Sequence, residues 1–345
     1  MYLQLFNGLK STKGHLHSHL KLYRTYNDQK SKFRNSNIRF YNFWDVGSIE
    51  DYWFYEFITH HKLNNQNRIV NFISVFGDRR IIRFLRKGKR IFFTGENLNI
   101  EDSLFPKHLK FEDHYGHQVD LALGFNYKEI MGANYMRFPL WLIYFVPPDS
   151  TLESLKRLID KLNSTETRTN ENRVRFAALI SRHDFQGIRT EIIETLKDFE
   201  TVSFPGKFKN NTFELKERYN DNKLEYLNNF KFNICPENSN TKGYVTEKLF
   251  HSIMAGCIPI YWGSNNLPEP DIINPEAVLF YDRDDNVKLI NQVRELTESE
   301  SVYEYFLRIP PFKDGAAEVI WGYLSELRSQ LDQVINIKKR ISGKI

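Results

Sequence analysis

The chain has 345 residues, of which 41% are hydrophobic and 26% charged, and its formal net charge is +5. This composition excludes an intrinsically disordered body, and the length suits two domains of ordinary size. The mild positive charge favours an anionic ligand or an anionic membrane surface, whereas neither a zinc-finger spacing nor an aromatic RNA-binding motif indicates a nucleic-acid partner. The two cysteines, Cys235 and Cys257, lie in apolar runs, so we expect reduced core thiols in a reducing compartment.

Residues 1–37 are predicted to form a loosely ordered basic leader, because Lys and Arg dominate a weakly patterned segment. The leader contains His15, His17 and His19, which would share one face of a strand, as metal ligands can. No cysteine or carboxylate joins them, so a solvated basic segment is the favoured alternative. We find neither a signal peptide nor a run of about 18 apolar residues, which indicates a cytoplasmic protein, soluble or peripheral to the inner membrane.

Residues 38–150 are predicted to form an N-terminal α/β domain. A pair with capping-box spacing, Ser48 and Asp51, precedes an aromatic-rich helix that ends near His60. Buried strands are predicted at "RIVNFISVF", at "RIFFTGEN", where the strand stops before Gly95, and at "VDLALGF". Short apolar runs separated by helices are typical of an open, mostly parallel sheet with helices on both faces.

Residues 151–172 form a polar connection with one short amphipathic helix, and a second α/β series is predicted over residues 173–325. Its predicted elements are the strand "VRFAALIS", the helix "GIRTEIIETLKDF", the strands "TVSF" and "FKFNICP", the helix "GYVTEKLFHSIMAG", and the strands "IPIYWG" and "AVLFYD". Residues 326–345 are predicted to form a basic amphipathic tail, for which a solvated helix end is favoured over a membrane-surface contact. The predicted architecture is two similar α/β lobes that face each other across a ligand-binding cleft.

The stretch "KFNICPENSNTKGYVTEKLFHSIMAGCIPIYWG" carries the densest set of candidate ligand contacts. At helical spacing, Glu247 and Lys248 lie opposite the apolar face, beside free N–H groups at a helix start that suit an anion. Tyr244 precedes this start, and Glu237 and Asn238 in the preceding loop can bind the hydroxyls of a ribose or sugar. From the residues alone, an ordinary amphipathic helix with a charged outer face is the favoured interpretation.

Arg189 repeats this arrangement, because it begins the helix that follows the strand "VRFAALIS" and a glycine. Cations at the strand ends of one lobe suit a pyrophosphate, and neither a G-x-G-x-x-G nor a P-loop motif occurs. In the other lobe, Glu96 follows a strand and a glycine, where a carboxylate can take a proton from a hydroxyl or serve only as a surface or capping group. Asp282 and Asp284 have the Asp-x-Asp spacing of a metal–diphosphate site, although a turn is favoured there.

These blocks resemble the α(1,3)-fucosyltransferases of glycosyltransferase family 10, especially the bacterial enzymes that build Lewis-type antigens. The resemblance is carried by "KFNICPENS", "GYVTEKLF" and "AGCIPIYWG", preceded in the family's order by "RIFFTGEN", "GFNYKEIMGANYMRFPLWL" and "FAALISRHDFQGIRTEII". It spans residues 38–270 and implies a GT-B fold of two Rossmann-like lobes, with the acceptor in the N-terminal lobe and GDP-fucose in the C-terminal lobe. The chain lacks the C-terminal heptad repeats of some members, and its polar linker is shorter, so oligomerisation through heptads is not expected.

The resemblance also implies roles for six residues. They are the general base Glu96, the diphosphate contacts Arg189 and Lys248, and the nucleotide and sugar contacts Asn238, Tyr244 and Glu247. The implied reaction is inverting transfer of L-fucose from GDP-β-L-fucose to O3 of GlcNAc in an N-acetyllactosamine-type glycan. No metal is required, and a divalent cation such as Mn²⁺ is expected at most to stimulate the reaction. The alternatives are a GT-B transferase of another nucleotide sugar and a non-catalytic glycan-binding protein of this fold.

Overall fold

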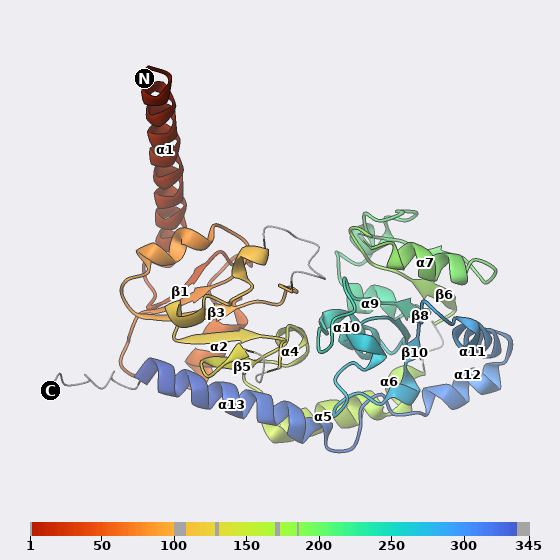
Figure 1. The fold of residues 1–345 in the computed structure, drawn as a ribbon. Coiled ribbons are helices and arrows are strands. Elements are labelled where there is room, and N and C mark those ends of the chain that lie inside the picture. The colour runs from red at the N-terminus through yellow and green to blue at the C-terminus, as the bar shows by residue number, and fades with distance from the viewer. Residues whose placement is uncertain (1, 100–107, 128–130, 170–172, 185, 337–345) are drawn as a thin grey trace.

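The chain folds into two lobes, each built around a five-stranded sheet whose strands all pair in parallel (Figure 1). The computed structural model describes residues 2–99, 108–127, 131–169, 173–184 and 186–336. Helices separate the strands along the chain and cover the sheets, as the alternation of short apolar runs and helical stretches predicted. The expected architecture of two α/β lobes is confirmed.

The N-terminal lobe has the strand order β1-β2-β3-β4-β5. The strands are β1 (Ile38–Tyr41), β2 (Val70–Ile73), β3 (Lys89–Phe93), β4 (Leu121–Gly124) and β5 (Tyr135–Arg137). Side chains alternate across each strand, so Phe72 packs on the face covered by α2 (Trp53–His60) and α4 (Trp141–Phe145), whereas Ile73 packs on the face covered by η1 (Arg79–Phe84). Strands β2, β3 and β4 are the three that the sequence predicted, and β1 and β5 extend the sheet at its edges.

The C-terminal lobe has the strand order β10-β9-β8-β6-β7. Its strands are β6 (Arg175–Ala178), β7 (Val202–Ser203), β8 (Phe230–Ile234), β9 (Ile258–Tyr261) and β10 (Leu279–Phe280). Its helices are α7 (Ile188–Thr195), α8 (Glu214–Glu217), α9 (Lys223–Leu227), α10 (Glu247–Met254), α11 (Val287–Glu298) and α12 (Glu300–Leu307). The order reverses between β6 and β8, which is the point where open α/β sheets bind ligands.

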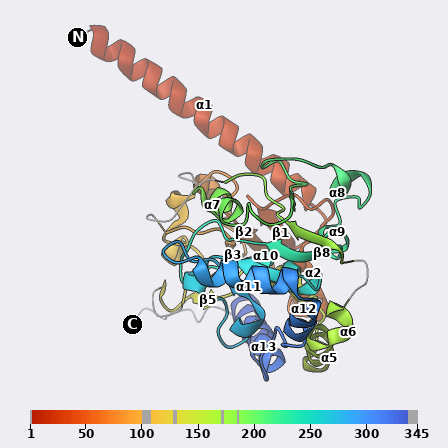
Figure 2. The same ribbon diagram turned by 90° about the vertical axis from the view of Figure 1, so that its right-hand side faces the viewer.

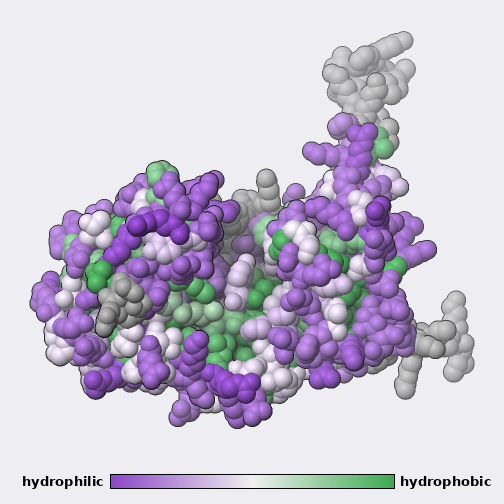
Figure 3. Space-filling view, turned by 180° about the vertical axis from the view of Figure 1, so that it is seen from behind, coloured by the Kyte–Doolittle hydropathy of each residue, from purple (hydrophilic) through white to green (hydrophobic). Residues whose placement is uncertain are grey.

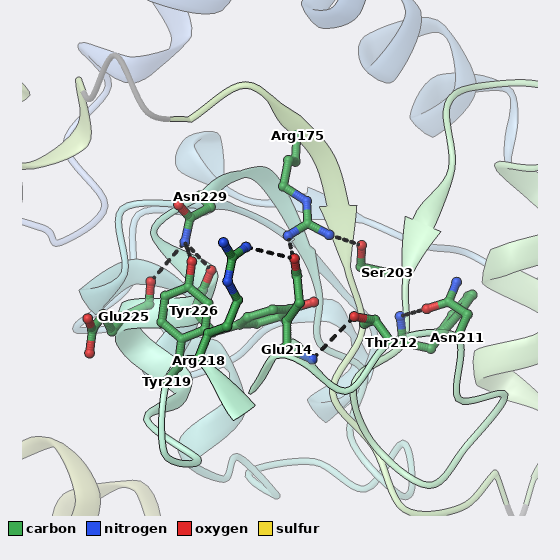
Figure 4. A network of polar contacts seen from close by, with 11 residues as sticks. Arg175, Ser203, Asn211, Thr212, Glu214, Arg218, Tyr219, Glu225, Tyr226 and Asn229 are labelled. Carbon is green, nitrogen blue, oxygen red and sulfur yellow. Dashed lines mark hydrogen bonds and ion pairs between the residues drawn. The ribbon is translucent and has the colours of Figure 1, made fainter. Parts of the chain in front are cut away.

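A polar network fixes α8 and α9 at the N-terminal edge of this sheet (Figure 4). Arg175, the first residue of β6, donates to Glu214 at 2.6 Å and to Ser203 at 2.9 Å. Its guanidinium also lies 4.3 Å from the ring centre of Phe230, the first residue of β8. Because Arg175 and Phe230 are the first residues of their strands, the loops at the carboxyl ends of β6 and β8 stay available for a site.

Three further helices connect the lobes along one side of the molecule (Figure 1). The expected linker helix is α5 (Leu152–Asn163), with Thr151 as a capping-box N-cap, and α6 (Thr165–Arg168) follows it. Helix α13 (Ala316–Asn336) runs beside α5 and buries Leu324, Leu327 and Leu331 in the core of the N-terminal lobe. The expected boundary between residues 325 and 326 therefore falls inside one helix, and the described part of the tail covers protein. Residues 337–345 lie outside the described residues.

The predicted loose leader is instead the long helix α1 (Tyr2–Lys32), which projects away from the N-terminal lobe in both views (Figures 1 and 2). Its end is held by aromatic packing, because the ring centres of Tyr26 and Phe84 lie 5.1 Å apart and Leu22 is buried. Residues two apart on a helix do not face each other, so the strand geometry on which the histidine metal hypothesis depended is absent. Within the described ranges, no three His, Cys, Asp or Glu residues are grouped for a metal, and no helix is long and apolar enough to cross a membrane.

Candidate active site

The candidate site begins at the reversal of strand order in the C-terminal lobe. Strand β6 leads into α7, and strand β8 leads through a loop into α10, so these two helices start on either side of the same point. Gly256 ends α10 in a left-handed conformation, as the sequence predicted, with the amide of Cys257 donating to the carbonyl of Ser252. The start of α10 is therefore fixed by strand β8 before it and by a defined turn after it.

Glu237 occupies the start of α10. Its carboxylate is fully buried and accepts hydrogen bonds from the backbone N–H and the hydroxyl of Thr246, both at 2.7 Å. Its Oε2 also lies 3.0 Å from the Nζ of Lys248. The expectation that Glu237 binds sugar hydroxyls is therefore wrong for this structure, since the side chain acts as a helix cap and orients the lysine.

Lys248 stays a cation in this setting. Burial opposes the charge of its ammonium, but Glu237 and Glu247 raise its pKa above the ordinary lysine value. The ammonium donates to Glu237 and, at 2.7 Å, to the hydroxyl of Thr246, and its side chain is 24% exposed. An ammonium has three N–H donors, so one donor remains for a ligand oxygen. Although burial opposes ionisation of Glu247, the neighbouring ammonium lowers the pKa of that carboxyl.

Arg189 lies behind the loop that follows β8. Asp184 accepts hydrogen bonds from the backbone amides of Arg189 and Thr190 at 3.0 and 2.9 Å, which fixes the start of α7. The buried guanidinium donates to Oδ1 of Asn238 at 2.9 Å and, more weakly, to the carbonyl of Pro236. Burial lowers the pKa of Arg189, although Asp184 opposes the shift. The structure thus brings Arg189 to the predicted site residue Asn238.

Glu96 faces this group from the other lobe. It follows β3, and its carboxylate makes no hydrogen bond or ion pair with the residues that the structure describes. Burial raises the pKa of Glu96, and the charges of Glu247 and Glu237 raise it further, whereas Lys248 lowers it. The side chain of the next residue, Asn97, contacts the loop between β8 and α10, so Glu96 lies at the boundary with the loop that leads to Glu247 and Lys248.

Tyr244 lies between the two lobes, where it is buried against the ring of Phe125, with ring centres 5.1 Å apart. Burial raises its pKa, and the carboxylates of Glu96 and Glu237 add to the shift. Tyr244 is therefore part of the boundary between the two lobes, and its expected contact with the donor would be made from that position.

Two residues of the site, Tyr144 and Lys223, were not predicted from the sequence. Tyr144 from α4 is 47% exposed and meets the ring of His251 from α10 edge to face at 5.8 Å. Glu247 and His251 are four residues apart on α10, so Tyr144 contacts the face of this helix that carries Glu247. Lys223, at the start of α9, lines a cavity of about 60 Å³ together with Arg189 and Lys248. Tyr144 stands in an apolar run and Lys223 in a polar one, so neither carried a signal in the sequence.

A buried ion pair holds the lobes together beside this site. Arg137, at the end of β5, pairs with Glu269 of the C-terminal lobe at 2.7 and 3.2 Å. The same carboxylate accepts a hydrogen bond from the indole of Trp141 at 2.9 Å, and Trp141 stacks on Phe250 of α10 with ring centres 4.2 Å apart. Next to Glu96, the amide of Asn97 donates to the hydroxyl of Ser239 at 2.8 Å. Seen from behind, the surface between the lobes is hollowed and exposes hydrophobic residues (Figure 3).

The Asp-x-Asp stretch forms a turn, as favoured from the sequence. The Oδ1 of Asp282 accepts a hydrogen bond from the backbone amide of Asp284 at 3.0 Å. Both residues line an open pocket of about 760 Å³ together with Trp262 and Arg283, whose guanidinium lies over the indole ring of Trp262 at 5.1 Å. The carboxylate of Asp282 is therefore used within its own turn.

The fold resembles a solved α1,3-fucosyltransferase in complex with GDP-fucose, at 21% sequence identity and a TM-score of 0.54. The alignment covers 89% of this chain and 92% of that one. The two lobes with their parallel five-stranded sheets match the GT-B fold of that enzyme, which confirms the expected fold class.

Two family models match the sequence. The N-terminal domain of α-(1,3)-fucosyltransferase FucT matches residues 38–144, and the C-terminal part of glycosyltransferase family 10 (fucosyltransferase) matches residues 169–309. The chain therefore belongs to glycosyltransferase family 10. It is 27% identical to α-(1,3)-fucosyltransferase FucT of Helicobacter pylori over 289 residues, which are 75% of this chain and 55% of that protein. It is 28% identical to α-(1,3)-fucosyltransferase B of Drosophila melanogaster over 92 residues, 27% of this chain and 21% of that protein. The chain thus spans about half the length, or less, of these curated relatives.

Proposed function

We propose that the chain transfers L-fucose, with inversion, from GDP-β-L-fucose to O3 of GlcNAc in an N-acetyllactosamine-type glycan, giving a Lewis-type product. One observation carries the proposal. Glu96 lies at the edge of the N-terminal lobe where the next residue, Asn97, contacts Ser239 of the C-terminal lobe, and the charge of Lys248 in that lobe lowers the pKa of Glu96. An inverting transfer needs a base and a leaving-group cation on opposite sides of the reacting carbon.

In this mechanism Glu96 takes the proton of the acceptor hydroxyl as that oxygen attacks the anomeric carbon of fucose. The bond from this carbon to the diphosphate breaks, and Lys248 stabilises the negative charge that develops on the leaving phosphate. Arg189 holds Asn238, and Lys223 adds a cation beside the same cavity. Tyr244 and Glu247 contact the nucleotide and sugar. These cations replace a metal ion, so activity should persist in excess chelator, with Mn²⁺ at most stimulatory.

The presence of an aromatic ledge in the N-terminal lobe supports the proposal that the acceptor is a sugar. We use this name for Trp44, Phe76 and His108, whose rings meet edge to face at 6.0 and 5.7 Å. Trp44 and Phe76 follow the carboxyl ends of β1 and β2, the same edge of the sheet from which Glu96 projects. Phe76 is 45% exposed, and an exposed ring can stack on the C–H face of a sugar.

The test is release of GDP from purified protein supplied with GDP-fucose, GDP-mannose or UDP-galactose, with and without oligosaccharide acceptors. We expect release from GDP-fucose alone, accelerated by N-acetyllactosamine, and linkage analysis should locate fucose on O3 of GlcNAc. Release from another donor would favour a GT-B transferase of different specificity. If no donor is consumed with any acceptor, the chain is a glycan-binding protein of this fold and the proposal fails.

A further inference from the structure

A second pocket lies at the opposite edge of the N-terminal sheet from Glu96. It has a volume of about 520 Å³ and is formed where the chain enters β2, β3 and β4. The pocket is lined by residues that include Arg68, Arg86, Gly88, Lys89, Arg90 and Asp120. Strand β3 is five residues long, or about 16 Å, so a ligand in this pocket is separated from the cleft by the length of the sheet.

The shape of the pocket is set by the backbone. Gly88 has a φ of +87°, and a Cβ at this position would lie 2.2 Å from the carbonyl oxygen of Ile69. Only glycine therefore lets the turn before β3 pack against the start of β2. This close approach fixes Arg86, Lys89 and Arg90 around one hollow.

The pocket holds more positive than negative charge. Asp120 is its single carboxylate, and it already lies 3.5 Å from the ammonium of Lys89 and accepts the backbone amide of Arg90 at 2.9 Å. In the part of the chain that the structure describes, Arg86 and the Arg90 guanidinium have no carboxylate partner. The Nε of Arg90 is buried and has no hydrogen-bond acceptor.

We propose that this pocket binds a phosphate-bearing ligand, with Arg86 and Arg90 contacting the phosphate. Arg90 lines the pocket, and its terminal N–H groups can donate to a phosphate oxygen, which would give the guanidinium the anionic partner that it lacks among the described residues. The planar guanidinium matches two phosphate oxygens at once, which a point charge does not. A volume of about 520 Å³ exceeds that of a lone ion, so the ligand carries a further group, such as a sugar or a lipid glycerol.

Two sources of such a phosphate can be separated by experiment. The full chain is titrated at low ionic strength with inorganic pyrophosphate by calorimetry, with excess GDP present to occupy the donor site. It is also sedimented with phosphatidylcholine vesicles that contain or lack phosphatidylglycerol. Pyrophosphate binding identifies a soluble phosphorylated ligand, and binding to the acidic vesicles alone identifies a lipid headgroup.

The variant R86Q/R90Q should weaken whichever binding is observed by about tenfold or more, since the charge-assisted hydrogen bonds of both guanidinium groups are lost. R157Q/R294Q removes the same charge at two exposed positions outside the pocket and should bind like the wild type. Thermal melting of both variants checks that they are folded, and R86Q alone, at an exposed position, provides a milder change. The proposal is overturned if neither probe binds, or if R86Q/R90Q and R157Q/R294Q weaken binding equally.

Discussion

Replacing Glu96 by Gln should remove the base of the proposed reaction while leaving the donor site intact. The amide has nearly the same shape, and the carboxylate makes no hydrogen bond or ion pair within the described ranges, so little structure depends on it. General-base catalysis contributes about 10²–10⁴-fold to a rate, so turnover should fall by that factor, which equals about 3–5 kcal/mol of activation free energy. Affinity for GDP should change little.

The pH dependence gives a sharper readout. Burial raises the pKa of Glu96, and Lys248 opposes the shift while Glu247 adds to it. A base works only when deprotonated, so kcat/KM should fall as the pH drops through this raised pKa. Lys248→Ala removes a lowering charge and should move the acidic limb to higher pH. Glu247→Gln removes a raising charge and should move the limb to lower pH.

The assay follows fucosylated product and released GDP by chromatography from acidic to neutral pH, and calorimetry gives the GDP dissociation constant. Two results would refute the reasoning. The first is normal turnover of Glu96→Gln. The second is an acidic limb that stays in place in both Lys248→Ala and Glu247→Gln, because the base would then lie elsewhere.

Three further substitutions test other parts of the site. Lys248→Ala should weaken GDP binding by about tenfold or more, since a charge-assisted hydrogen bond to the diphosphate is lost, and an unchanged dissociation constant would exclude Lys248 from the donor site. Phe76→Ala should raise the KM for the acceptor while leaving the acceptor-free hydrolysis of GDP-fucose unchanged; equal effects on both would remove the ledge from the acceptor site. Glu269→Gln should destabilise the protein by about 3–5 kcal/mol, because it leaves a buried arginine unpaired, whereas Glu318→Gln at an exposed ion pair should change the melting temperature little. Similar melting temperatures for Glu269→Gln and Glu318→Gln would contradict the assignment of Glu269 to a buried ion pair and of Glu318 to an exposed one.

The sequence predicted which residues lie near one another better than it predicted what each side chain contacts. Periodicity placed Glu247 and Lys248 on the open side of a helix, and both lie there half-buried. It could not show that Glu237, ten residues earlier, caps that helix, because only the folded loop brings the carboxylate to the Thr246 amide. Tyr144 was missed for a similar reason, since its run is apolar and only packing against α10 exposes it to the site.

The fold was predictable where hydrophobic patterns are local. The apolar runs at β2, β3, β4, β6, β8 and β9 are strands, since each is bounded by turn residues. The leader was not predictable as a helix, because its order depends on distant partners: Tyr26 stacks on Phe84, which belongs to a segment more than fifty residues away. The position of α13 could not be predicted either, because the apolar residues along one face of the helix do not indicate which lobe they pack against.

Helix α13 also determines when the first lobe can finish folding. A ribosome releases the chain from the N-terminus, so residues 38–145 emerge long before residues 316–336. Until then the apolar surface on α5 and the N-terminal lobe that Leu324, Leu327 and Leu331 cover remains open to water. The N-terminal lobe is thus completed by a segment that is made after the strands of the C-terminal lobe, and the C-terminal lobe can fold before it. Residues 38–150 expressed alone would present this apolar face to solvent and would aggregate, unless a peptide of residues 316–336 were added.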